Sequence, residues 1–153
     1  KSGAWECHPS EATIAIAERG MIRLYDAMTG NVLWASEELA SSLETLLWTP
    51  DGRLLVGMLA DRRVCVWNGA TGKLQATMGV TASPGTRWTF ASDRETLLGV
   101  DREGTLSAWH PKSGSKLFNL RSTVPIDPFG FDIDSRGRLL FSSSARPPVI
   151  RFD

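Results

Sequence analysis

The side chains that most often perform catalysis or bind metals are few in this sequence. The chain contains two histidines, His8 and His110, and two cysteines, Cys7 and Cys65. Metal sites and nucleophilic sites need such side chains at short fixed spacings, and HExxH, CxxC and GxSxG patterns are absent from the sequence. We therefore predict no catalytic residue, no metal site and no cofactor. The histidines are predicted to serve as turn or packing residues, and the cysteines to be buried, reduced thiols.

Carboxylates are plentiful, but they fall mainly where the chain turns. Asp51 and Asp93 are examples, and an aspartate at a turn ordinarily bonds to nearby backbone amides. No pair of carboxylates is set apart by its spacing as a general acid and base. Asp127, Asp132 and Asp134 lie close together in the sequence, which leaves a cation site there as an alternative.

Arginines recur beside carboxylates in four short segments between apolar runs. These segments read Glu18-Arg19, Asp61-Arg62-Arg63, Asp101-Arg102-Glu103 and Ala145-Arg146. A guanidinium group makes paired, charge-assisted hydrogen bonds and stacks on aromatic rings, so arginine is favoured in protein interfaces. The alternative is four ordinary solvated turns. The candidate partner-binding residues are Arg19, Asp61, Arg62, Arg63, Asp101, Arg102 and Arg146.

A repeat of 42 residues organises the chain around these segments. Residues of one type recur at the same position of each repeat, and each such set is called a column. One column is Tyr25, Trp67 and Trp109, and another is Gly30, Gly72 and Gly114. A third column, Cys7, Trp48, Phe90 and Ile133, has intervals of 41, 42 and 43 residues. A fourth consists of the apolar pairs Ile14–Ile16, Leu54–Val56, Leu97–Gly99 and Leu139–Phe141. Several columns that share one period indicate a repeat architecture.

Each repeat reads as short β-strands separated by turns that contain glycine or proline. The strands are predicted near 5–8, 13–17, 21–25 and 32–36; 44–48, 54–58, 63–67 and 74–78; 87–90, 96–100, 105–109 and 116–120; and 129–133, 138–142 and 148–152. Apolar residues alternate or form short runs within these ranges, as expected for strands. A spacing of about ten residues between strands is typical of an antiparallel meander.

A four-stranded sheet cannot bury both of its faces alone, but sheets stacked around an axis bury one another. We therefore predict an all-β protein, a β-propeller segment of about four blades, with the last blade lacking its outer strand. The chain is treated as one segment, 1–153, with blades at approximately 1–38, 39–80, 81–122 and 123–153. The four arginine hairpins would then open on the same rim.

The repeat resembles the WD-repeat family. Trp48-Thr-Pro-Asp-Gly52, then Val66-Trp67-Asn68, then Thr71-Gly72, follow that family's order of aromatic turn, apolar–Trp–Asp strand and Thr-Gly turn. The Trp-Asp pair itself reads Tyr-Asp, Trp-Asn, Trp-His or Phe-Asp here, and the family's Gly-His pair is absent, so its hydrogen-bonded tetrad is not expected. The resemblance implies a non-enzymatic scaffold that binds other proteins in a multiprotein complex.

A second resemblance is confined to the first repeat. Asp26-Ala-Met-Thr-Gly30 followed by Trp34 is similar to the docking motif of quinoprotein propellers. That likeness implies a pyrroloquinoline quinone enzyme or a lipoprotein assembly factor, and it is the alternative function. The equivalent position holds Ala76 in the second repeat and Phe118 in the third.

Composition narrows the class of partner. Lysine plus arginine and aspartate plus glutamate both total 17, so the formal net charge is zero, whereas nucleic-acid binders normally carry a positive excess. No apolar run of membrane-spanning length is present. We expect protein partners, no nucleic acid and no membrane, in a cytoplasmic setting, with a cytoskeletal or ciliary complex as a narrower alternative. Since the last blade lacks a strand, the remainder of a larger propeller or a second copy is a further expected partner.

Overall fold

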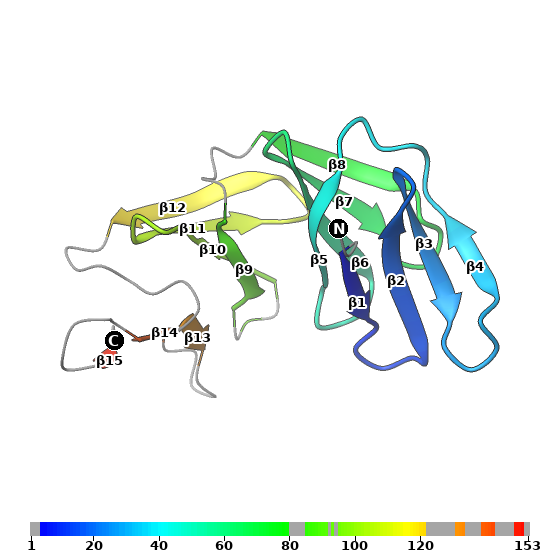
Figure 1. Ribbon diagram of the computed structural model, residues 1–153. Coiled ribbons are helices and arrows are strands. Elements are labelled where there is room, and N and C mark those ends of the chain that lie inside the picture. Colours follow the sequence, from blue (N-terminus) through cyan, green and yellow to red (C-terminus); the bar gives the residue numbers. More distant parts are fainter. Residues whose placement is uncertain are drawn as a thin grey trace. The chain divides into compact units, whose positions relative to one another are not determined.

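The computed structural model describes residues 4–79, 85–91, 93, 95–121, 131–133, 139–142 and 149–151. The chain divides into two compact units, Lys1–Val80 and Thr81–Asp153 (Figure 1). The described residues form β-strands joined by turns and irregular connections, with no helix among them. The all-β prediction is therefore confirmed for this part of the chain.

The first unit contains two four-stranded antiparallel sheets, each ordered as its strands follow in the sequence. Sheet 1 consists of β1 (Trp5–Cys7), β2 (Thr13–Glu18), β3 (Met21–Asp26) and β4 (Val32–Ala35). Sheet 2 consists of β5 (Leu43–Trp48), β6 (Leu54–Leu59), β7 (Arg63–Asn68) and β8 (Leu74–Gly79). Sequential pairing of this kind is the meander that the repeat predicted.

The second unit contains one further four-stranded antiparallel sheet and a smaller one. Sheet 3 consists of β9 (Arg87–Phe90), β10 (Leu97–Val100), β11 (Thr105–His110) and β12 (Ser115–Arg121). A three-stranded sheet consists of β13 (Phe131–Ile133), β14 (Leu139–Ser142) and β15 (Val149–Arg151). Every strand begins and ends within two residues of its predicted range. Three blade-like sheets are thus established, while much of the predicted fourth blade, 123–153, lies outside the described residues.

The repeated glycines occupy the same turn between the third and fourth strands of each sheet. Gly30, Gly72 and Gly114 have φ angles of 72°, 68° and 69°, a left-handed conformation that glycine adopts without a steric penalty. In sheet 1 the Asp26 carboxylate accepts the amides of Met28 and Thr29, each at 2.8 Å. Side-chain capping of the turn and a left-handed glycine explain why this column recurs.

One predicted column is shifted by a residue in sheet 2. Cys7 and Tyr25 both pair with Ile14 in sheet 1, whereas Trp48 and Trp67 both pair with Leu55 in sheet 2. Leu55, and not Leu54, is therefore the equivalent of Ile14. The sequence misplaced it because β6 is buried along its whole length, so apolar residues run continuously and do not mark which face each residue joins.

Sheets 1 and 2 pack face to face around one hydrophobic core. Sheet 1 contributes Ala15, Ile22 and Leu24, and sheet 2 contributes Leu55 and Trp67 among others. Trp67 is 2% exposed and is the largest fully buried side chain described. The prediction that the aromatic residue of the third strand packs between blades is confirmed for Trp67.

The two cysteines differ, which corrects part of the prediction. Both are free thiols, and Cys65 is buried as expected, but Cys7 is exposed. Cys7 pairs with Ile14 and alternates with the half-buried Glu6 along β1. Because neighbouring residues of a strand point to opposite faces, Cys7 lies on the face of sheet 1 that does not meet sheet 2.

Candidate functional site

The two arginine hairpins of the first unit are built from backbone that few residues adopt. Arg19 has a φ of 50° and Arg62 a φ of 71°, and these are the only described residues other than glycine with positive φ. Such angles are uncommon for side chains with a Cβ atom, although the tight hairpins that follow strand twist demand them. Each hairpin therefore holds an arginine at its tip in a fixed backbone conformation.

Asp61 and Arg63 form a pair within the second of these hairpins. Arg63 donates to the Asp61 carboxylate from its Nε at 2.9 Å and from its terminal nitrogen at 2.6 Å, and its amide donates at 3.1 Å. These bonds, with the Arg63 side chain contributing most, lower the pKa of Asp61. The Arg63 guanidinium is therefore bonded within its own hairpin.

Arg19 and Arg62 are exposed, and neither guanidinium donates a hydrogen bond to another described residue. Glu18, the carboxylate that precedes Arg19 in the chain, is hydrogen-bonded to other side chains. Its carboxylate accepts hydrogen bonds from the Tyr25 hydroxyl and, at 2.7 Å, from Arg23. The bonds from Tyr25 and Arg23 lower the pKa of Glu18. The two tip arginines thus remain available to an external carboxylate.

Both hairpins of the first unit border one groove of about 690 Å³. The connection from β4 to β5 runs along it: the Leu39 amide donates to the Gly20 carbonyl at 2.7 Å, and the Ala60 amide to the Ser42 carbonyl at 2.8 Å. The apolar lining residues include Met21, Leu39 and Leu43. The sequence did not identify this lining, because the connection at 37–42 has no apolar periodicity.

The arginine hairpin of the second unit is organised by Asp101. Its carboxylate accepts the amides of Glu103 at 3.0 Å and Thr105 at 2.7 Å. Arg102 is exposed, and its guanidinium lies against Gly85: a Cβ built on that glycine would be 3.0 Å from Arg102 Nε. Arg146 lies outside the described residues. A rim shared by all four hairpins therefore remains a prediction.

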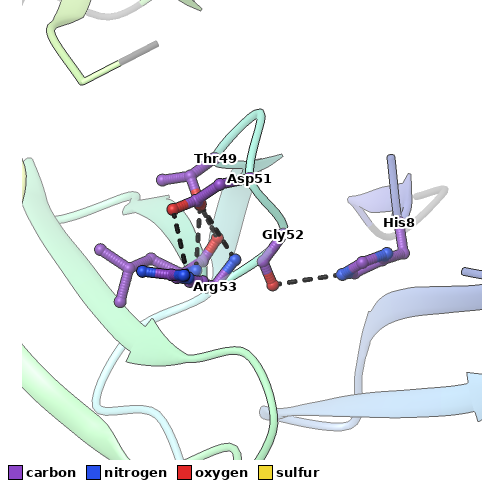
Figure 2. Close-up of polar contacts among 6 residues, drawn as sticks. His8, Thr49, Asp51, Gly52 and Arg53 are labelled. Carbon is purple, nitrogen blue, oxygen red and sulfur yellow. Dashed lines mark hydrogen bonds and ion pairs between the residues drawn. The ribbon is translucent and has the colours of Figure 1, made fainter. Parts of the chain in front are cut away.

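His8 joins sheet 1 to sheet 2 at the opposite end of the strands from these hairpins (Figure 2). Its Nδ1 accepts the amides of Glu11 at 3.0 Å and Ser10 at 3.3 Å, so Nε2 carries the proton and donates to the Gly52 carbonyl at 3.1 Å. The imidazole also meets the Trp48 ring edge-on, with centroids 4.7 Å apart. His8 is therefore the turn and packing residue that was predicted.

Gly52 can accept His8 only because it lacks a side chain. A Cβ at Gly52 would lie 2.2 Å from His8 Nε2, and Gly52 has a φ of 69°. Thr49 braces this turn, since its hydroxyl donates to Asp51 at 2.6 Å and accepts the Leu54 amide at 3.0 Å. Figure 2 shows how the braced turn directs the Gly52 carbonyl toward the imidazole.

We expect His8→Ala to lower the free energy of unfolding by about 2 kcal/mol, from the lost hydrogen bond and ring contact. Urea denaturation followed by tryptophan fluorescence measures the change. Glu11→Ala is the matched control, because Glu11 contributes only its backbone amide to His8. Equal stability of His8→Ala and the control variant would contradict a joining role for His8.

Trp34 makes a second contact between sheets 1 and 2. Its indole nitrogen donates to the Gly69 carbonyl at 2.9 Å. The ring covers Gly72, where a built Cβ would be 2.4 Å from the indole. Of the residues that resemble a quinoprotein docking motif, Trp34 thus makes a contact between sheets 1 and 2.

Metal-binding side chains do not cluster among the described residues. No three of their histidine, cysteine, aspartate or glutamate side chains come close enough together to hold a metal ion. The side chains of Asp127, Asp132 and Asp134 are outside the described set, so the cation alternative there is not tested. Within the described part of the chain, no segment forms a helix with the length and hydropathy needed to span a bilayer.

Comparisons with known proteins agree with the blade geometry. No protein-family model matches the chain. A stretch of 90 residues is 29% identical to polyadenylation factor subunit 2 of Candida albicans, covering 59% of this chain and 17% of that protein. The crystal structure of the computationally designed Ika8 protein superposes with a TM-score of 0.69 at 16% identity, covering 97% of this chain and 44% of the designed one. The chain thus spans less than half the length of each of these two proteins.

Because its identity is low, the likeness to the designed protein supports the fold alone. The sequence likeness to the Candida albicans protein supports the repeat. Three four-stranded antiparallel sheets, a shared 42-residue period and these two likenesses point the same way. The chain is a WD-repeat propeller-like protein.

Proposed function

We propose that this chain is a non-catalytic scaffold that binds other proteins through its hairpin rim. The observation that carries the proposal is the pair of tip arginines, Arg19 and Arg62, held by strained hairpins and left without hydrogen-bond partners among the described residues. The hairpins fix the backbone from which each guanidinium extends, and a guanidinium forms paired, charge-assisted hydrogen bonds with a carboxylate. Arg102 is the corresponding exposed arginine of the second unit.

The groove beside the tips supports a protein as the partner. Met21, Leu39 and Leu43 supply apolar lining, and Ser41 and Ser42 supply hydroxyl groups. An apolar centre with a polar, arginine-bearing edge is the usual composition of a protein interface. A segment that carries an acidic side chain next to an apolar one would satisfy both parts of this surface.

The setting that we propose is an intracellular multiprotein complex in which this chain is a segment of a larger propeller. The lengths of the two matched proteins support a larger ring, since the chain corresponds to 44% of the designed one. Two free thiols suit a reducing compartment. The zero formal net charge favours protein over nucleic acid as the partner.

Charge reversal at the two tips tests the proposal. In the Arg19→Glu/Arg62→Glu variant, we expect binding of a purified partner to weaken by about tenfold or more, because each lost charge-assisted contact is worth 1 kcal/mol or more. Partners are first identified by comparative affinity capture and quantitative mass spectrometry, and their affinities are then measured by titration calorimetry.

Arg53→Glu is the matched control, since Arg53 is an exposed arginine in the β5–β6 turn, with its side chain 81% exposed. That variant carries the charge change of one tip substitution, half that of the double variant, away from the tips, and should bind as the original chain does. If purified partners bind the tip variant and the original chain equally, while its circular dichroism is unchanged, the rim does not bind them.

A further inference from the structure

A pocket separate from the hairpin groove lies between sheets 1 and 2, beside the contact of His8 with Gly52 (Figure 2). Its volume is about 280 Å³, just below the range of about 300–1,000 Å³ that is usual for drug-sized ligands. Its lining includes the exposed residues Glu11, Leu33 and Ala70, so the pocket opens to solvent. A pocket of this size suits one side chain of a partner.

Neither of the side-chain donors in the described lining of this pocket is free for a ligand. His8 Nε2 donates to the Gly52 carbonyl at 3.1 Å, and the Trp34 indole donates to the Gly69 carbonyl at 2.9 Å. His8 Nδ1 accepts two backbone amides, so both nitrogens of the imidazole are used. A phosphate or carboxylate would therefore find no free side-chain donor in this lining.

Backbone amides along the same wall are also used, whereas acceptors remain. The amides of Gly52 and Gly69 each donate to a backbone carbonyl at 2.8 Å, and the Ala70 amide donates to the Asn68 side chain at 3.1 Å. The carbonyls of Gly52 and Gly69 each keep a second lone pair. The Glu11 carboxylate forms no hydrogen bond or ion pair with another described residue. The pocket therefore favours a ligand that donates hydrogen bonds.

The Trp34 indole adds a flat aromatic surface to these acceptors. A Cβ built on Gly72 would be 2.4 Å from Cε3 and 2.8 Å from Cδ2 of this indole, so Gly72 covers one face of the ring. Gly72 does not line the pocket, so the pocket meets another part of the indole. Glu11 is the one residue of the described lining with a charged side chain. An aromatic ring beside a carboxylate attracts a cation.

We propose that this pocket binds the side chain of an arginine from a partner protein. The guanidinium donates to the Glu11 carboxylate and to a free lone pair of the glycine carbonyls, and its plane stacks on Trp34. Lysine fits less well, because its ammonium group is a compact, strongly hydrated charge that cannot stack. This site lies at the opposite end of the strands from the arginine tips. The inference goes beyond the rim function and does not depend on it.

Titration of the intact chain with N-acetyl-arginine methylamide tests the proposal. The indole N–H resonance of Trp34 is followed by nuclear magnetic resonance and is identified as the one that Trp34→Phe removes. We expect this resonance to shift in a saturable way. The capped citrulline derivative has nearly the same shape without the charge, and it should bind about fivefold more weakly or worse. The capped lysine derivative should also bind more weakly than the arginine one.

Glu11→Gln should weaken binding of the capped arginine about fivefold or more, because it removes the charge-assisted hydrogen bond. Glu38→Gln is the matched control. Glu38 is exposed, and its Cγ would be 3.8 Å from a Cβ built on Gly20, at the hairpin end of sheet 1. The control variant should bind as the original chain does. The Arg19→Glu/Arg62→Glu variant should also bind the capped arginine normally, so failure of the rim proposal is distinguishable from failure of this one.

Three results would overturn the arginine pocket. The first is the absence of a saturable shift at the Trp34 resonance up to the solubility limit of the capped arginine. The second is equal binding of the arginine derivative and either the citrulline or the lysine derivative. The third is equal binding by Glu11→Gln and the original chain while circular dichroism shows both to be folded.

Discussion

Replacing Trp67 with alanine is expected to lower the free energy of unfolding by about 3–5 kcal/mol, the usual cost of removing a large buried aromatic side chain. Trp67 is 2% exposed and belongs to the core shared by sheets 1 and 2. Its ring fills the space over Gly57, where a built Cβ would lie 2.9 Å from the indole. Because the surrounding core side chains fill the cavity only in part, the loss includes both transfer and cavity terms.

Urea denaturation monitored by circular dichroism measures this loss, and Trp5→Ala is the matched control. Trp5 lies on the equivalent face of sheet 1, but it is 61% exposed. Its removal is expected to change the free energy of unfolding by no more than about 0.5 kcal/mol, as for most surface substitutions. If the two variants lost similar amounts of unfolding free energy, the conclusion that Trp67 packs in the core between sheets 1 and 2 would be wrong.

The second large effect is expected at Gly72. Gly72→Ala should cost about 2–4 kcal/mol, since an alanine at a φ of 68° carries roughly 1–2 kcal/mol of backbone strain and overpacking adds a similar amount. The added methyl group would sit 2.4 Å from the Trp34 indole. Trp34 would have to leave the turn, and its hydrogen bond to the Gly69 carbonyl would be lost.

Gly30→Ala separates the two contributions. Gly30 has a φ of 72° and open space around its Cα, so its replacement reports backbone strain alone, about 1–2 kcal/mol. Thermal or urea denaturation measures the loss of unfolding free energy in each variant. The amount by which the loss in Gly72→Ala exceeds that in Gly30→Ala is the contribution of the Trp34 contact. In a Trp34→Ala background the two glycine variants should cost the same. A persistent difference would mean that the Gly72 turn is constrained by something other than Trp34.

Gly30 and Gly72 show how much of the structure the sequence repeat alone can predict. The columns of aromatic and glycine residues correctly placed the strands and turns, because period-2 patterns and left-handed turns are local properties of the chain. The turn glycines at 30 and 72 look alike in the sequence. Their different energetic roles arise only because Trp34 of sheet 1 reaches one of them, which no local pattern encodes.

The arginine hairpins illustrate a similar limit. Their positions followed from charged residues between apolar runs, and the sequence alone indicated four similar candidates. The structure separates Arg63, which is bonded to Asp61, from Arg62, which is exposed at the hairpin tip. This distinction depends on whether a guanidinium finds a carboxylate within its own turn, and adjacent residues of one hairpin can differ completely in that respect.

The sequence by itself determined the all-β class, the strand ranges and the 42-residue repeat, because strand and turn preferences are set by neighbouring residues. Tertiary structure alone decided which face of each sheet is covered: it exposed Cys7, buried Cys65 and made Leu55, not Leu54, the counterpart of Ile14. Burial on both faces erases the alternation that would reveal orientation. Contacts between sheets join residues that are distant in the sequence, such as Trp34 and Gly69, which lie 35 positions apart, and these contacts decide which face is covered.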